Sequence, residues 1–411
     1  MSSSTRAADR QLSLTYPERT RWRTNAGFVL ALTAVAAMMA GASAPSPFYP
    51  VLQERIGFSA GTMTIIFAVY AVALLLTLLV AGSLSDHLGR RPVISAGMII
   101  LAASMIIFWQ AGSVETLIGA RIVQGIAAGL LLASLPAAVV DLEPPSRPGS
   151  AAVLNTVTPI AGLAVGALVA GSALDLVDEA AFGTVFVGSA MLFVALGLLI
   201  WWAPETSPRA EGLLTSLRPQ VGVPAPARAA FLRALPALIA SWATGGLYLS
   251  LGAPLVEREL GGTSHLSQGL VVTALAVGGS TTCFVARAWT ARRTTLYGTT
   301  ALASGMALTL LALGAASLPW FLVASVIAGT GFGAAFLGVM RSLTPLVGAH
   351  QRGELFAAVF VASYLAFGLP AVIAGFASGE VGLLVTTYGY GAGVVLLAAV
   401  AALLRRFGTT D

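Results

Sequence analysis

The sequence predicts an all-α polytopic membrane protein, with twelve membrane-spanning helices in two six-helix bundles that repeat one another. Three observations predict this fold. The 411 residues are 57% hydrophobic and only 9% charged, whereas a soluble domain carries roughly 25% charged residues. The apolar residues gather in twelve long runs, and the basic residues lie almost entirely on one side of these runs. A chain so poor in charge must present its surface to the lipid bilayer.

Each apolar run is about long enough to cross a bilayer, which takes about 20 residues in a helix. Isolated glycine, proline, serine and threonine residues inside the runs are normal for membrane helices. The apolarity is continuous and does not alternate with period two, which excludes a β-barrel. The predicted spans cover residues 26–49, 60–83, 92–112, 116–140, 150–172, 181–202, 234–255, 267–286, 295–316, 319–345, 354–377 and 382–404.

The first run has features of a cleaved secretory signal, because arginines precede it and Ala42-Ser43-Ala44 follows near its end. The first bundle would lack a helix without this run. We therefore expect it to remain as an uncleaved first span.

The basic residues predict the orientation. All 22 are arginine. With a cytoplasmic amino terminus, 19 of them fall on the cytoplasmic side, Arg55 and Arg258 fall outside, and Arg121 lies within a span. This distribution follows the positive-inside rule. It predicts a multi-pass protein of the inner (plasma) membrane with both termini cytoplasmic. Because the arginines are scattered between apolar runs, we expect no nucleic-acid partner.

The chain divides at a polar, proline-rich stretch. The predicted organisation is a cytoplasmic segment 1–25, a bundle 26–202, a cytoplasmic linker 203–233, a second bundle 234–404 and a cytoplasmic tail 405–411. An offset of 204 aligns the bundles, because it pairs Gly125 with Gly329 and Gly129 with Gly333. Parallel repeats joined in this way form a transporter architecture that binds its substrate near the midplane.

The loop after the second span contains a motif that favours a conformational switch. It reads Gly82-Ser-Leu-Ser-Asp86-His-Leu-Gly89-Arg90-Arg91-Pro. Glycine permits a tight turn and close helix approach, and a carboxylate is stabilised near a helix amino terminus. Arg90 can pair with Asp141, which ends the fourth span on the same side. We predict that this pair forms when the cytoplasmic side is closed.

The string G-x-L-x-D-x-x-G-R-R resembles the hallmark loop of the major facilitator superfamily. The resemblance covers essentially the whole chain, and it implies the major facilitator fold and transport by alternating access. His87 departs from the pattern, because the family usually has Arg or Lys there. The second-half copy, Arg287 to Arg293, keeps only the basic residues.

The fourth span contains Arg121-Ile-Val-Gln124-Gly125, which resembles the family's R-x-x-Q-G motif of proton-coupled members. A charge inside the membrane is costly and usually functional. We therefore expect Arg121 to line the central cavity and to couple substrate binding to the conformational change. Snorkelling of its side chain to the outer headgroups is the alternative.

The fifth span contains the glycines Gly162, Gly166 and Gly171, which resemble a degraded form of the family's antiporter motif. Ala167 stands where that motif has proline, and Pro159 is a second possible source of a kink. Close helix packing alone also explains small residues. The motif thus favours antiport only in part.

No acidic residue lies deep in a predicted span, which argues against a strongly cationic substrate. The candidate cavity residues are Tyr70, Asn155, Trp242, Tyr248 and Tyr364. A phosphate-binding loop G-x-x-x-x-G-K-[ST] is absent from a chain without lysine, so a nucleotide-driven pump is excluded.

These features predict a secondary transporter, most consistent with efflux of a small amphipathic or neutral compound, with the proton as the candidate coupling ion. An importer of a sugar, organic acid or other metabolite is the second reading. A membrane-embedded enzyme is the third, but the three histidines lie in separate loops and form no catalytic or metal cluster. We expect a monomer without cofactor or metal.

Overall fold

The structure is a computed structural model that describes residues 18–177, 180–207, 209–219, 221–348 and 351–407. Within these ranges, twelve helical segments are long and apolar enough to cross a membrane. The α-helices are α2 (Glu18–Ser43), α3 (Phe48–Ile56), α4 (Ala60–Ala81), α5 (Leu84–Leu88), α6 (Arg90–Trp109), α7 (Val114–Asp141), α8 (Ser150–Val177), α9 (Gly188–Leu199), α10 (Leu213–Ser216), α11 (Arg228–Arg258), α12 (His265–Val285), α13 (Ala291–Gly314), α14 (Leu318–Leu343), α15 (Arg352–Val381) and α16 (Leu383–Phe407).

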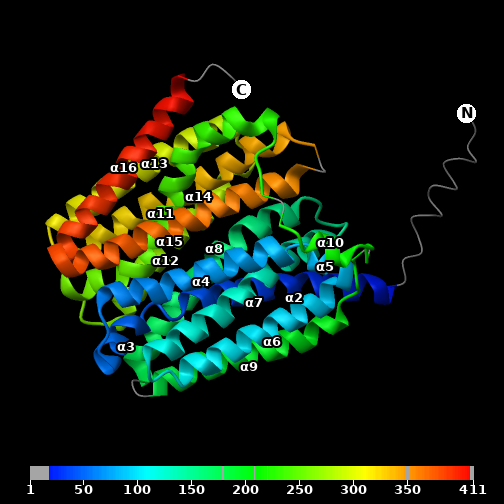
Figure 1. Ribbon diagram of the computed structural model, residues 1–411, viewed down its shortest axis with the longest axis horizontal. Helices are drawn as coiled ribbons and strands as arrows, with labels where there is room; N and C mark the ends of the chain where they lie inside the picture. Colours follow the sequence, from blue (N-terminus) through cyan, green and yellow to red (C-terminus); the bar gives the residue numbers. More distant parts are fainter. Residues whose placement is uncertain (1–17, 178–179, 208, 220, 349–350, 408–411) are drawn as a thin grey trace, which may run out of the picture.

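The helices form two bundles that lie side by side (Figure 1). Helices α2–α9 make the first half and α11–α16 make the second. The short helices α5 and α10 lie at one end of the bundles, and α3 lies at the opposite end. We call these ends the linker face and the far face. The predicted fold class is thereby confirmed.

The first span is broken, whereas the sequence predicted one run over 26–49. Helix α2 ends at Ser43 and α3 begins at Phe48. Pro45 and Pro47 lie between them, and proline has no backbone N–H with which to continue a helix. The carbonyl groups at the end of α2 therefore need other partners.

The two halves repeat the same close helix contact. At Gly125, an added Cβ would lie 2.6 Å from the carbonyl oxygen of Tyr70, so only glycine lets α7 approach α4 this closely. At Gly329, an added Cβ would lie 2.1 Å from the carbonyl oxygen of Leu275, where α14 crosses α12. Helices α7 and α14 are the fourth spans of their halves, and α4 and α12 are the second. The predicted offset of 204 thus pairs equivalent contacts.

The halves meet along two helix pairs, α8 with α12 and α4 with α15. On the far-face side, Ser46 Oγ donates to the carbonyl oxygen of Leu249 at 3.0 Å, and Arg258 donates to Gln53 at 3.3 Å. Deeper in the interface, the Phe67 and Phe367 rings pack with their centroids 4.9 Å apart. The halves are therefore in contact at the far face.

The seventh span is longer than the sequence indicated. Helix α11 begins at Arg228, within the predicted linker 203–233, and runs for 31 residues. Its first turns are polar because Arg228 and Arg233 lie there, and both arginine side chains also donate to nearby backbone carbonyl groups. A long arginine side chain can reach the headgroup region from such a position.

Candidate functional site

The loop after the second span is organised around Arg90. Its guanidinium lies 2.5 Å from Asp86 Oδ1 and 3.2 Å from Asp141 Oδ2, and it donates to Ser85 Oγ at 2.6 Å. Arg90 therefore connects the loop to the end of α7. The pair of Arg90 with Asp141 is present while the halves touch at the far face, so the pair does not require the far face to be open.

The loop is also held by Glu205, which lies just after the sixth span. The carboxylate accepts hydrogen bonds from the backbone N–H groups of Arg90 at 2.8 Å and Arg91 at 3.2 Å, and it lies 3.5 Å from the Arg91 guanidinium. These N–H groups open helix α6 and have no partner inside it. Gly89 has φ +113, and an added Cβ there would lie 2.8 Å from Glu205. Glycine is thus required both by the turn and by the carboxylate.

The surroundings of Glu205 keep it ionised. Partial burial alone would raise the pKa of its carboxyl group. Backbone hydrogen bonds from Ser207, Arg90, Arg91 and Thr206 outweigh the burial and hold the pKa below its ordinary value.

Gly82, the first residue of the motif, lies in the turn between α4 and α5.

The second half fastens its corresponding loop differently. Arg341, near the end of α14, donates to the carbonyl oxygens of Ala286 at 2.8 Å, Arg287 at 2.9 Å and Trp289 at 3.1 Å. No carboxylate takes part in these three bonds. The two halves therefore anchor equivalent loops, one through ionised carboxylates and the other through backbone carbonyl groups.

Arg121 is buried inside the first half with 1% of its surface exposed. It donates to the Tyr49 hydroxyl at 2.7 Å and also to the side-chain oxygen of Gln124. Its guanidinium lies 5.3–5.5 Å from the ring centroids of Tyr49, Tyr70 and Phe108. Within the part of the chain that the structure describes, no carboxylate pairs with it. The charge is stabilised by hydroxyl and amide oxygens and by aromatic faces.

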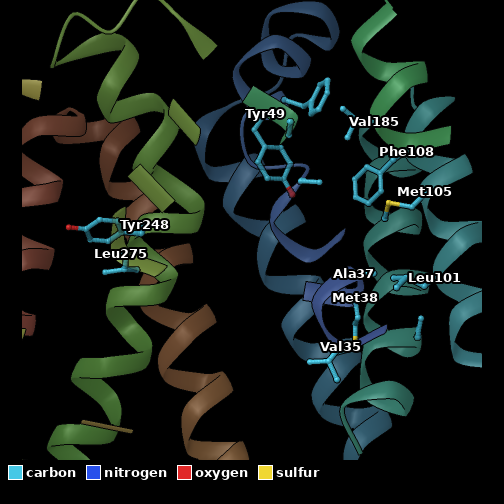
Figure 2. Close-up of a cluster of buried hydrophobic side chains, with 14 of the residues drawn as sticks. Val35, Ala37, Met38, Tyr49, Leu101, Met105, Phe108, Val185, Tyr248 and Leu275 are labelled. Carbon is cyan, nitrogen blue, oxygen red and sulfur yellow. The ribbon is translucent and has the colours of Figure 1, made fainter. Parts of the chain in front are cut away.

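The bond from Arg121 fixes the orientation of the Gln124 side chain. With its oxygen turned toward Arg121, Gln124 donates its amide N–H to the carbonyl oxygen of Gly41 at 2.8 Å. In an unbroken helix that carbonyl would accept from residue 45, but Pro45 has no N–H. Gln124 therefore replaces the hydrogen bond that is missing at the break in the first span. Figure 2 shows the Tyr49 and Phe108 side chains, which belong to one buried hydrophobic cluster.

Three of the five candidate cavity residues meet where the halves touch. Tyr70 of α4 belongs to one buried cluster with Tyr364 and Phe367 of α15, and Trp242 packs against that cluster. The Trp242 and Tyr364 ring centroids are 5.0 Å apart. Tyr70 also faces the Arg121 guanidinium. The Tyr70 side chain therefore lies between Arg121 and the surface where the halves touch.

The other two candidates lie elsewhere. Tyr248 is buried in the second half, where its hydroxyl is 2.9 Å from Ser325 Oγ and 3.2 Å from Thr309 Oγ1. Figure 2 shows its hydroxyl pointing away from Tyr49. Asn155 lies on α8, and its side-chain amide donates to the carbonyl oxygen of Pro136 on α7 at 2.9 Å. Both side chains thus have partners within their own halves.

The glycines of the fifth span allow close packing on two sides. Added Cβ atoms at Gly162 and Gly166 would lie 2.5 and 2.0 Å from carbonyl oxygens of α2, within the same half. An added Cβ at Gly171 would lie 2.6 Å from the carbonyl oxygen of His265, in the other half. Helix α8 continues through Pro159 from residue 150 to residue 177.

The fold agrees with the comparisons with known proteins. The sequence profile of the Major Facilitator Superfamily matches residues 30–371. The chain belongs to the major facilitator superfamily. It is therefore a multi-pass membrane transporter of small molecules and not an enzyme.

Solved structures of the superfamily have the same fold. A bacterial homologue of the human lysosomal transporter Spinster, in an inward-facing and occupied conformation, superposes with a TM-score of 0.71. It is 14% identical, and the match covers 92% of this chain and 96% of that one. The proton:xylose symporter XylE superposes with a TM-score of 0.68 at 14% identity, over 94% and 96% of the two chains. At these identities the likeness shows the fold alone.

The sequence relatives match over shorter segments. The quinolone resistance protein NorA of Staphylococcus aureus (strain Mu50 / ATCC 700699) is 24% identical over 98 residues, which are 24% of this chain and 25% of NorA. The multidrug resistance protein MdtL of Shewanella sp. (strain ANA-3) is 31% identical over 80 residues, 20% of each chain. The matches thus span a quarter or less of these relatives.

Sequence reasoning missed two residues that the structure brings into these contacts: Tyr49 and Glu205. Each lies next to the end of a span, where polar residues are common and carry little information. For Glu205, the signal was a carboxylate directly after the sixth span, on the side of the arginine-rich loop. For Tyr49, the signal was a hydroxyl placed just after the Pro45–Pro47 break.

Proposed function

We propose that the protein exports a small, neutral or amphipathic aromatic compound by alternating access and couples the export to protons. The aromatic surface between the halves carries the proposal. It combines Phe67 and Tyr70 of the first half with Trp242, Tyr364 and Phe367 of the second. Aromatic rings favour flat apolar ligands through stacking. Motion of the two halves would separate these rings and expose them first to one side of the membrane and then to the other.

The charges near this surface support a substrate without strong positive charge. In the described membrane helices, every carboxylate lies within a few residues of a helix end. Arg121 lies behind Tyr70 and contributes a positive potential. An organic cation would meet no countercharge here, whereas a neutral or weakly anionic compound would be accepted. The names of the partial relatives NorA and MdtL, both resistance proteins, support export as the direction.

Proton coupling would need a group that titrates. Arginine stays charged at any accessible pH, so Arg121 would act by its field and would not carry the proton. The carriers would be carboxylates at helix ends. The described ones in the spans are Glu54, Glu115, Asp141, Asp175, Glu257, Glu354 and Glu380.

We also propose that the linker face is cytoplasmic, because the sequence assigns 19 of the 22 arginines to the same side of the membrane as the linker. The expected result is that cysteine at position 214 resists a membrane-impermeant maleimide in intact cells, while cysteine at position 112 reacts. Leu214 is 82% exposed on the linker face, and Gly112 is exposed on the far face with open space beside it. The native Cys283 is buried and gives little background. Reaction at position 214 but not at position 112 would reverse the orientation.

Flux into proteoliposomes tests the transport proposal. The panel holds a neutral planar aromatic compound, a sugar, an organic acid and an organic cation, each with and without an imposed pH gradient. We expect the aromatic compound to move, and to move faster with the gradient. Trp242→Ala should raise KM several-fold, whereas Trp320→Ala, which alters a ring that is 68% exposed, should leave KM unchanged. If only the sugar or the organic acid moved, the result would favour metabolite import and contradict export of an aromatic compound.

A further inference from the structure

The far-face end of α8 is joined to α12 of the other half by a single carboxylate. Asp175 accepts hydrogen bonds from the backbone N–H groups of His265 and Leu266, each at 2.8 Å. Its Oδ1 also lies 3.0 Å from Nδ1 of the His265 ring. An ionised carboxylate can only accept, so this ring nitrogen carries the hydrogen. One side chain of the first half therefore makes three bonds to the second.

These bonds complete the amino-terminal end of α12. The first four N–H groups of a helix have no partner within it, and together they carry a partial positive charge. Within α12, the side chain of the cap residue Ser264 accepts from the N–H of Ser267. Asp175 takes the N–H groups of His265 and Leu266. The helix is thus capped partly by its own chain and partly by the opposite half.

The backbone brings the two helices close enough for this contact. An added Cβ at Gly171 would lie 2.6 Å from the carbonyl oxygen of His265, and one at Gly269 would lie 2.4 Å from that of Ala167. Glycine at both positions keeps Asp175 within bonding distance of α12. The contact therefore depends on the halves being closed at the far face.

Asp175 also differs from the other carboxylates that contact a basic side chain. Among the described residues, the three ion pairs of arginine join Arg90 or Arg91 to Asp86, Asp141 and Glu205, which all belong to the first half or the segment that follows it. The pair of Asp175 with His265 is the one that crosses between the halves.

We propose that Asp175 is a positioning residue of the transport cycle, a latch that holds the far face closed by capping α12. The inference rests on the alternating access of the proposed function. To open the far face, the halves must separate, and Asp175 must release both N–H groups and the imidazole. The latch therefore sets how often this face opens.

The test measures opening directly, without substrate. Thr64 is fully buried on α4, and it touches Gly375 across the interface near the far face. A cysteine introduced at position 64 should react with a soluble thiol reagent only when that face opens. We expect Asp175→Ala to raise the reaction rate roughly ten-fold in purified protein, since it removes a charged acceptor of several bonds. Asp175→Asn, which keeps one acceptor oxygen, should give a smaller rise.

Two further variants keep the test decisive. His265→Ala removes one of the three bonds and should raise the rate less than Asp175→Ala does. Gln110→Ala changes an exposed far-face side chain and should leave the rate unchanged. An unchanged rate in folded Asp175→Asn and His265→Ala protein would overturn the latch, even if Asp175→Ala failed to fold. A changed rate in protein that moves none of the panel compounds would keep the latch and remove the export proposal.

Discussion

Arg121→Lys is expected to reduce transport at least ten-fold, and Arg121→Ala to reduce it to background. The guanidinium donates to Tyr49 and Gln124 at once and lies against three aromatic rings. Lysine keeps the charge but lacks the planar, multi-donor head. Each lost hydrogen bond to a charged group is worth about 1.5–3 kcal/mol, and the groups left behind are buried.

The consequence for the cycle runs through Gln124. Without Arg121, its amide is free to turn, and the Gly41 carbonyl at the break in the first span loses its oriented donor. The two pieces of that span would then no longer be held to α7. Flux into proteoliposomes with purified protein measures the loss of transport. The thermal unfolding transition shows how much of that loss comes from reduced stability.

Arg293→Lys is the matched control. Its guanidinium also lies on an aromatic ring, 4.3 Å from the Trp289 centroid, but it is exposed. We expect nearly normal flux from this variant. If Arg121→Lys transported at the wild-type rate with an unchanged pH dependence, a coupling role for Arg121 would be untenable.

Asp86→Asn and Glu205→Gln are expected to fail in different ways. Asp86 is 44% exposed and pairs with Arg90, which has a second partner in Asp141. Its loss should therefore leave the thermal transition almost unchanged. We expect transport to fall several-fold, because Arg90 would no longer be held between loop and helix as the halves move.

Glu205→Gln should instead lower stability by about 1–2 kcal/mol, because it weakens the bonds that cap α6. Thermal unfolding in detergent and flux in proteoliposomes separate the two effects. Glu211→Gln changes an exposed carboxylate nearby and serves as the control. Normal flux in well-folded Asp86→Asn protein would show that Asp86 has no part in switching.

Much of the fold followed from composition, from the length of the apolar runs and from the positions of the arginines, which are all properties of the chain itself. The residues that emerged only from the structure depend on which helix ends meet. Glu205 is 115 residues from Arg90, and Asp175 is 90 residues from His265, so no local pattern joins them. The break in the first span is a partial exception. Pro45 and Pro47 were visible in the sequence, but the continuous apolarity around them concealed the interruption.

The R-x-x-Q-G motif also shows that contacts between distant parts of the chain cannot be predicted from a local pattern. Its intramembrane charge was evident from sequence, and it suggested a group facing the cavity. The structure places Arg121 one layer deeper, with a bond through Gln124 to a carbonyl that Pro45 leaves without a donor. That bond depends on Pro45, which is far from Arg121 in the chain.

The two linker-face anchors also respond differently to acid. Because its pKa lies below the ordinary value, Glu205 contributes stability that is fully present above its unfolded pKa and is lost only as the pH falls through the lower folded value. It therefore remains ionised throughout the physiological range. Arg341 donates to backbone carbonyl oxygens, which do not titrate in the physiological pH range. Neither Glu205 nor Arg341 can act as a proton sensor, so any response to a pH gradient must arise from other groups in the molecule.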